Sequence, residues 1–159
     1  MSILRKRRLR MNKPYYRYAQ EVIEGKIVAG EFIRSACERF FSLMEDDRYE
    51  FREDKVDDVI NFFPYLKHFK GRHADKPFTL EPWQEWIVAS IYGFYVREDG
   101  SRLTQTVYIE VARKNGKTAL AAGIGLNALI NDGGVFCGKL KGASENIRVA
   151  SVFELRQEI

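Results

Sequence analysis

Apolar residues recur at helical spacing in three segments within the first 70 positions of the chain. These segments span residues 15–30, 31–45 and 54–69, and each predicts an amphipathic helix. Gly25 or Gly30 is expected to end the first helix, and Pro64 is expected to kink or end the third. The residues expected on the buried faces are Tyr15, Tyr18, Val22, Phe32, Ala36, Phe40, Leu43, Val56, Val59, Ile60 and Phe63. The pattern therefore predicts an N-terminal helical layer.

The segment from 78 to 100 predicts one helix followed by a turn. Thr79 is a candidate cap, and Pro82 lies near the expected start, because proline is tolerated in the first helical turn. Residues 98–100 have the composition of a turn. The expected buried face of the helix consists of Trp86, Ile87, Ser90, Ile91 and Phe94.

Residues 103–112 alternate between apolar and polar side chains, which favours a strand with Val107, Ile109 and Val111 on one face. The elements expected after it are a helix over 116–132, a short strand over 134–138 and a last helix over 143–159. This order of elements predicts an α/β fold that contains the beginning of a parallel sheet.

The composition narrows the class of protein. The chain has 159 residues, of which 45% are hydrophobic, so we expect one folded domain of ordinary size. The sequence contains neither an apolar run long enough for a membrane helix nor a signal peptide. Its two cysteines, Cys37 and Cys137, lie far apart, which favours a reducing compartment over a disulfide framework or a zinc site.

The net charge of +4 is unevenly distributed along the chain. Residues 1–19 contain seven lysines and arginines and no acidic residue, so the remaining residues sum to about −3. Such a basic arm suits contact with nucleic acid phosphates, and it is equally typical of a solvated tail. We therefore expect a basic arm over 1–19, a helical subregion over 20–76 and an α/β domain over 77–159.

A short basic loop joins the predicted strand to the helix that follows it. Gly116, Lys117 and Thr118 match the end of the phosphate-binding pattern G-x-x-x-x-G-K-[ST], whereas Val111 stands where the first glycine is expected. Three such residues recur by chance, but the strand and the helix around them are the setting that phosphate binding requires. The loop therefore predicts a phosphate cradle, with a basic loop that binds no nucleotide as the alternative.

The sequence EPWQEW at 81–86 is a second candidate site. The Gln84 amide can form paired hydrogen bonds with adenine, and the ring of Trp83 can stack on a base. Tryptophans in such a pattern, here Trp83 and Trp86, are more often core anchors. Gln84 lies 33 positions before Lys117, so the two motifs support each other.

These motifs resemble those of the large terminase subunit of tailed bacteriophages, in the branch with LEPWQ and a deviant Walker A loop of the form RKNGK[ST]. The similar segments are 25–40, 77–94 and 108–129. The resemblance implies a P-loop NTPase-like fold and an ATP-driven motor that packages viral DNA into procapsids. It also implies ATP and Mg²⁺ as cofactors, double-stranded DNA, the portal protein and the small terminase subunit as partners, and the cytoplasm of a bacterial host as the location. In the full-length motor it implies a homo-oligomer.

The resemblance also implies individual roles. Lys117 matches the Walker lysine, Thr118 the hydroxyl on the magnesium side, and Arg113 the arginine that contacts phosphate and helps to trigger hydrolysis. Gln84 matches the glutamine that senses adenine. The residues expected to bind the nucleotide are Trp83, Gln84, Arg113, Lys114, Asn115, Gly116, Lys117 and Thr118, with Arg113 and Lys117 catalytic.

The sequence departs from the family pattern after Asn131. Residues 133–142 are rich in glycine and lysine, and no apolar strand that ends in Asp-Glu follows. We therefore expect a P-loop sheet that is incomplete and an ATPase domain that is truncated before Walker B. This chain alone is expected to have little or no turnover, as in a split gene or a broken prophage gene.

Two alternatives remain open at this point. The chain could belong to another adenine-reading P-loop motor, such as a helicase, whose cradle would be the same. It could also be a non-catalytic fragment that binds DNA or packaging partners through its arm and helical layer.

Overall fold

A computed structural model describes residues 12–66, 77–112 and 115–131. The predictions for the strand at 134–138 and the helix at 143–159 lie outside these residues. The chain divides into two compact units: unit 1 consists of Met1–Ile60 and Leu80–Leu103, and unit 2 of Asn61–Thr79 and Thr104–Ile159.

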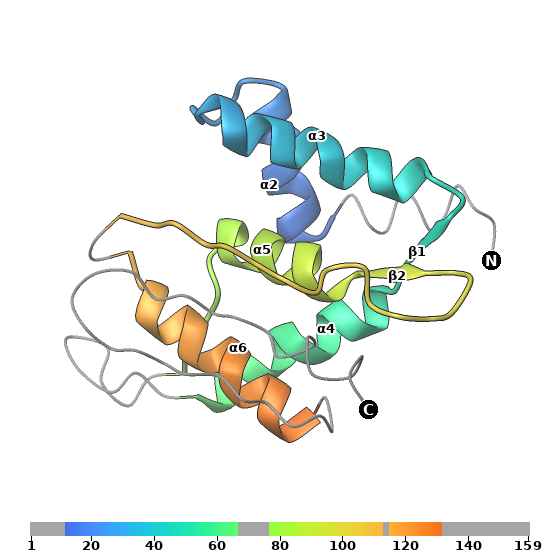
Figure 1. Cartoon of the computed structure of the whole chain (residues 1–159). Helices are drawn as coiled ribbons and strands as arrows, with labels where there is room; N and C mark the ends of the chain where they lie inside the picture. Colours follow the sequence, from blue (N-terminus) through green and yellow to red (C-terminus); the bar gives the residue numbers. More distant parts are fainter. Residues whose placement is uncertain (1–11, 67–76, 113–114, 132–159) are drawn as a thin grey trace. The chain divides into compact units, whose positions relative to one another are not determined.

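Unit 1 contains the helical layer that the sequence predicts. Its helices are α2 (Pro14–Ile23), α3 (Glu31–Glu45), α4 (Glu53–Phe62), whose last two residues belong to unit 2, and α5 (Pro82–Tyr92). The short helix α2 lies between α3 and α5 and packs against both (Figure 1). Tyr15 and Val22 are fully buried as predicted, whereas the predicted Tyr18 is half-buried and Ala19, which was not predicted, is fully buried.

Two short strands, which the hydrophobic pattern did not reveal, complete unit 1. Strand β1 (Tyr49–Phe51) pairs in antiparallel register with β2 (Phe94–Val96), so that Phe51 lies opposite Phe94. This is the sheet of the described residues, and the predicted parallel sheet is not found among them. The expected turn at 98–100 is confirmed, because the Gly100 N–H donates to the Val96 carbonyl at 2.8 Å and Gly100 has a φ of +71°.

The aromatic core of unit 1 explains where α5 ends. The rings of Phe40, Phe51 and Phe94 pack edge to face, with centroids 5.0–5.8 Å apart. Phe94 was predicted on a face of α5, and this prediction is wrong. The helix ends at Tyr92, and Phe94 instead pairs with Phe51 in the sheet.

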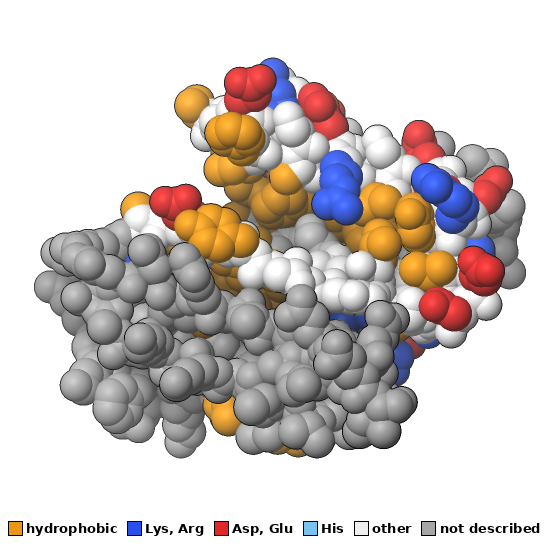
Figure 2. All heavy atoms as spheres, in the orientation of Figure 1, with side chains coloured by type: hydrophobic (Ala, Val, Ile, Leu, Met, Phe, Trp, Pro, Cys, Tyr) orange, Lys and Arg blue, Asp and Glu red, His pale blue; other side chains and the backbone are white. Residues whose placement is uncertain are grey.

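Helix α3 buries a different face from the predicted one. Phe40 is buried as expected, but Phe32 is 91% exposed and Ala36 is also exposed. Cys37 takes the inner position, and burial raises the pKa of its thiol to about 11, so the thiol stays protonated at neutral pH. Figure 2 shows hydrophobic side chains on the surface of unit 1, where Val28 and Phe32 are the most exposed.

Unit 2 buries the rings of Phe63 and Phe78. A 3₁₀ turn, η1 (Phe63–Tyr65), follows α4, so the expected helix break at Pro64 is confirmed. The Phe63 ring lies 5.7 Å from the Phe78 ring and fills the space beside Gly123 of α6 (Lys117–Asn131). A glycine at position 123 therefore lets α6 approach this ring closely.

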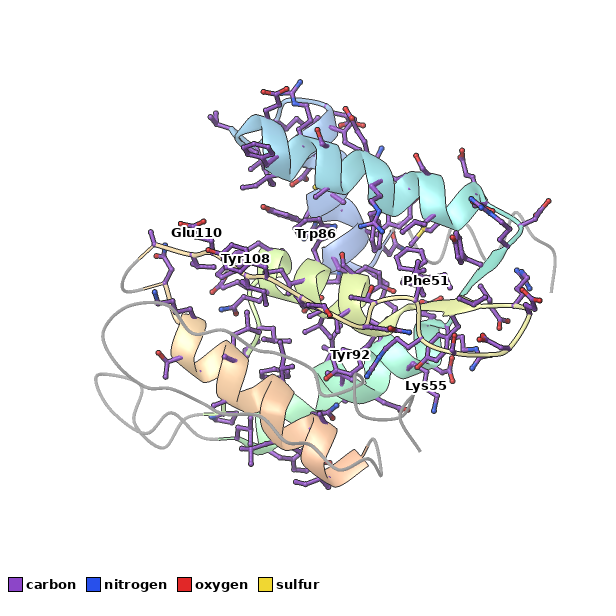
Figure 3. The ribbon with its side chains drawn as sticks, in the orientation of Figure 1. Phe51, Lys55, Trp86, Tyr92, Tyr108 and Glu110 are labelled. Atoms are coloured by element: carbon purple, nitrogen blue, oxygen red, sulfur yellow. The ribbon has the colours of Figure 1, made fainter. Side chains whose placement is uncertain are left out.

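The segment before α6 is not a strand, which corrects the prediction for 103–112. Val107, Ile109 and Val111 are half-buried, whereas Tyr108 and Glu110 are exposed, so the predicted alternation is present. Figure 3 shows Tyr108 and Glu110 on this segment. A strand also requires a ladder of hydrogen bonds with a neighbouring strand, and the sheet of the described residues consists of β1 and β2 and does not include 104–112.

The packing beside Gly93 gives a first testable prediction. An alanine Cβ at position 93 would overlap the Phe51 ring and the Ala89 carbonyl oxygen. Gly93→Ala is therefore expected to lower the free energy of unfolding by about 1–3 kcal/mol. Gly30→Ala is the matched control, because nothing lies within 4 Å of its added Cβ and its φ is −66°. Urea unfolding of both variants checks this, and equal losses would contradict it.

Candidate nucleotide-binding site

The loop that enters α6 depends on a left-handed glycine. Gly116 has a φ of +72°, a conformation that other residues adopt only at a cost of about 1 kcal/mol or more. Its carbonyl accepts the Leu120 N–H at 3.0 Å, which is the first bond of the helix. The amides of Lys117, Thr118 and Ala119 precede this bond, and the first amides of a helix have no partner within it. The turn therefore presents backbone donors at the start of α6.

The Lys117 side chain folds back over the loop. Its Nζ lies 3.5 Å from the Val111 carbonyl oxygen, at the long limit of a hydrogen bond. Val111 is the position where a Walker A loop has its first glycine. The ammonium therefore spans the loop from the helix start to the end of the preceding extended segment. Such a weak contact is easily exchanged for a stronger anionic acceptor.

The other loop residues are solvent-accessible. Asn115 and Thr118 are exposed, which leaves the Thr118 hydroxyl open to a ligand in the first turn of α6. Arg113 and Lys114 lie outside the described residues. The structure therefore brings Asn115, Gly116, Lys117 and Thr118 together in unit 2.

Gln84 has a structural role that the sequence analysis missed. Glu81, rather than the predicted Thr79, is the N-cap residue of α5, and its backbone N–H donates to Gln84 Oε1 at 2.9 Å. This is the arrangement of a capping box, in which the side chain at N3 reaches back to the N-cap. The sequence contains a local signal for this capping box, because the pattern Glu-x-x-Gln precedes an apolar run.

This bond fixes the orientation of the Gln84 amide. Since a backbone N–H is always a donor, the atom that faces it must be the oxygen, and Nε2 must point the other way. Gln84 is only 4% exposed, so the rest of its environment holds this orientation. The amide keeps its two Nε2 hydrogens and a second lone pair on Oε1 for other partners.

The two tryptophans of EPWQEW differ in their surroundings. Trp86 packs against the core of unit 1, and its ring centroid lies 5.7 Å from that of Tyr18 on α2 (Figure 3). Trp86 is therefore a core anchor, which is one of the two roles that the sequence analysis considered for it. Trp83 is half-buried in the first turn of α5. Trp83 and Gln84 belong to unit 1, whereas Asn115–Thr118 belong to unit 2.

The comparison with known protein families indicates a class of protein for part of the chain. Residues 82–148 match the family model of an ATPase domain, and this range contains Trp83, Gln84 and the whole basic loop. The family is that of the terminase large subunit, so residues 82–148 are similar to the ATPase domain of that subunit. This family implies a role in phage DNA packaging. No curated protein and no solved structure matched the chain in the same comparison.

Among the helices of the described residues, none combines the length and the apolar character needed to cross a bilayer.

The capping bond of Gln84 gives a second prediction. Gln84→Met removes the acceptor of the Glu81 N–H while it keeps the side-chain length, so the free energy of unfolding should fall by about 1 kcal/mol. Gln105→Met is the control, because Gln105 is exposed and lies outside the helices. Thermal unfolding followed by circular dichroism measures the difference. If both variants unfold at the same temperature, the cap does not stabilise α5.

Proposed function

We propose that this chain binds ATP through residues 113–118 and forms the nucleotide-binding part of a motor that packages viral DNA into procapsids. One observation carries the proposal: a left-handed Gly116 is followed by Lys117 and Thr118 in the first turn of α6, inside the ATPase family match. A P-loop NTPase-like fold with a parallel sheet is part of the same proposal.

The phosphates are bound by backbone and side-chain donors together. The start of α6 carries the positive end of the helix dipole, and its first amides point away from the helix towards the loop. Lys117 adds a full positive charge, and Arg113 and Lys114 add two more from the same loop. A triphosphate carries several negative charges, so it is a much better acceptor for Lys117 than the Val111 carbonyl. We therefore propose that Lys117 moves from that carbonyl to the β- and γ-phosphates.

The residues present also fit a divalent metal. Thr118 is exposed in the turn that follows Lys117, and a hydroxyl at this place is a suitable ligand for Mg²⁺ beside phosphate oxygens. When bound, the metal neutralises negative charge on the phosphates. Thr118 holds it in this proposal, and Arg113 contacts the phosphates and helps to trigger hydrolysis.

Adenine is read by the first turn of α5. The capping bond leaves the Gln84 amide with a donor and an acceptor, which is the pair that adenine requires at N7 and N6. The ring of Trp83 is the candidate stacking surface. Because the amide is already oriented, little conformational entropy is lost when a base binds.

The wider role follows from the family. We propose double-stranded DNA, the portal protein and the small terminase subunit as partners, a homo-oligomeric motor, and the host cytoplasm as its location.

A non-catalytic docking role is the second candidate. The observation that favours it is the apolar surface at the start of α3, where Val28 and Phe32 are almost fully exposed. Apolar side chains exposed to this degree are typical of surfaces that contact another protein.

Removal of the lysine tests nucleotide binding directly. Lys117→Ala is expected to weaken binding of a fluorescent, nonhydrolysable ATP analogue by about 10- to 100-fold, because a charge-assisted hydrogen bond is lost. Lys55→Ala, which removes an exposed charge on α4, is the control and should bind normally (Figure 3). Unchanged binding in Lys117→Ala would contradict the cradle.

A conservative change at Gln84 separates adenine recognition from helix capping. Gln84→Glu keeps an acceptor for the Glu81 N–H but lacks the amide donor, and the burial of its carboxylate is expected to lower the free energy of unfolding. Its preference for ATP over GTP should fall by about tenfold, because one bond of a paired set is lost. Competition titrations with both nucleotides measure this preference. An unchanged preference would leave Gln84 with its capping role alone.

A further inference from the structure

Helix α6 lies against the ring of Phe63 within unit 2. The Phe63 side chain is completely buried, and a Cβ added at Gly123 would overlap its Cε1 and Cζ atoms. The ring therefore occupies the place of a side chain at position 123. Gly123 is buried, as are Leu120 and Ile124, and such three- and four-residue spacings place these positions on one face of the helix.

The Phe63 ring is itself held by its own segment. The Phe63 carbonyl accepts the Leu66 N–H at 2.9 Å, and the Leu66 carbonyl accepts the Phe78 N–H at 2.8 Å. The Phe78 ring then packs against the Phe63 ring, with 5.7 Å between the centroids and 37° between the planes. Two backbone bonds and a ring contact thus fix the surface against which α6 lies, and a ring in a close-packed interior has little room to shift.

The contact with the ring lies close to the basic loop. Gly123 follows Lys117 by six residues, which is about 9 Å along the helix axis. Between them, the Leu120 N–H donates to the Gly116 carbonyl at 3.0 Å, so the inner face of α6 is bonded directly to the left-handed turn. A regular helix moves as a rigid element over so short a distance, and a shift at Gly123 is therefore passed on to Lys117.

We propose that Phe63 is a positioning residue for the phosphate site, because its ring sets how far the start of α6 extends towards the bound phosphates. This inference rests on the proposed function of residues 113–118. Phe63 contacts no phosphate and acts only through α6. Hydrogen bonds weaken steeply when their geometry is disturbed, so a small displacement of the Lys117 and Thr118 amides is enough to lower affinity.

A purely structural role for Phe63 makes a different prediction. Loss of packing at the ring would then lower the free energy of unfolding, but the protein that remains folded would bind nucleotide with its native Kd. A positioning role changes the Kd of the folded protein. It also requires that a second substitution which restores the fit between ring and helix restores the Kd.

The experiment is a double-mutant cycle in the whole chain, with a fluorescent, nonhydrolysable ATP analogue as the probe. Gly123→Ala should raise its Kd about tenfold, because the new methyl group pushes α6 away from the ring. Phe63→Leu should raise it about threefold, because α6 loses part of its support. Leucine lacks the Cε1 and Cζ atoms that the methyl group would meet, so the Kd of the double variant should return to within about twofold of the native value.

Two controls show where the effect lies. Gly93→Ala creates the same kind of overlap with an aromatic ring, that of Phe51, but in unit 1, and it should keep the native Kd. Inorganic tripolyphosphate, which has no base, should compete less well with the analogue in Gly123→Ala, by the same factor of about ten, because the change lies at the phosphates. All titrations are run at a temperature at which circular dichroism shows each variant to be folded.

The outcomes separate this inference from the proposed function. Absence of analogue binding in the native chain would overturn the proposed function and the positioning role with it. Normal binding in the native chain with an unchanged Kd in both single variants would overturn only the positioning role, and so would an equal rise in Gly93→Ala or an additive rise in the double variant. If Gly123→Ala does not fold, Phe63→Leu, which only removes atoms, is compared with Gly93→Ala and decides the question by the same criterion.

Discussion

The Phe51 ring occupies the space that a side chain at position 93 would need, and much of unit 1 follows from this contact. Gly93 lets the end of α5 approach β1, and Phe94 can then pair with Phe51 in the sheet. Phe40 closes the group from α3. One residue without a side chain therefore sets the point at which helix turns into strand, and it connects three elements that lie far apart in the sequence.

The first turn of α5 is held by one side chain. Gln84 is used by the fold, because its oxygen accepts the Glu81 N–H and caps the helix. In the function we propose, the same bond also orients the remaining donor and acceptor of the amide for a base. Gly116 likewise has two roles in the loop before α6. Its left-handed conformation starts the helix and presents the first amides of that helix. In each case the conformation is set by the backbone before any ligand arrives.

Charge also joins parts of the helical layer. The excess of cations in the first 19 residues suggests a purely external role for the arm, yet Lys13 is engaged by Asp57 of α4, whose two carboxylate oxygens each lie 2.8 Å from the Lys13 Nζ.

Local features of the sequence determined the helices and the basic loop. Helical periodicity placed α2, α3, α4 and α6, and Gly-Lys-Thr marked the start of α6, because these signals depend on neighbouring residues. The Glu-x-x-Gln capping signal was also local, although it was overlooked in favour of Thr79. The family resemblance came from the same local motifs, and the ATPase family match over 82–148 confirmed it.

Only the tertiary structure decided the rest. The partners β1 and β2 are three residues each and lie more than 40 positions apart, so neither has a recognisable period without the other. The inner face of α3 was set by its neighbours, which bury Cys37 and leave Phe32 exposed. The Lys13–Asp57 pair joins the start of α2 to α4, and no spacing in the sequence could indicate it. Local bonds are encoded by adjacent residues, whereas pairing, burial and shared charges depend on which distant segments the folded chain brings together.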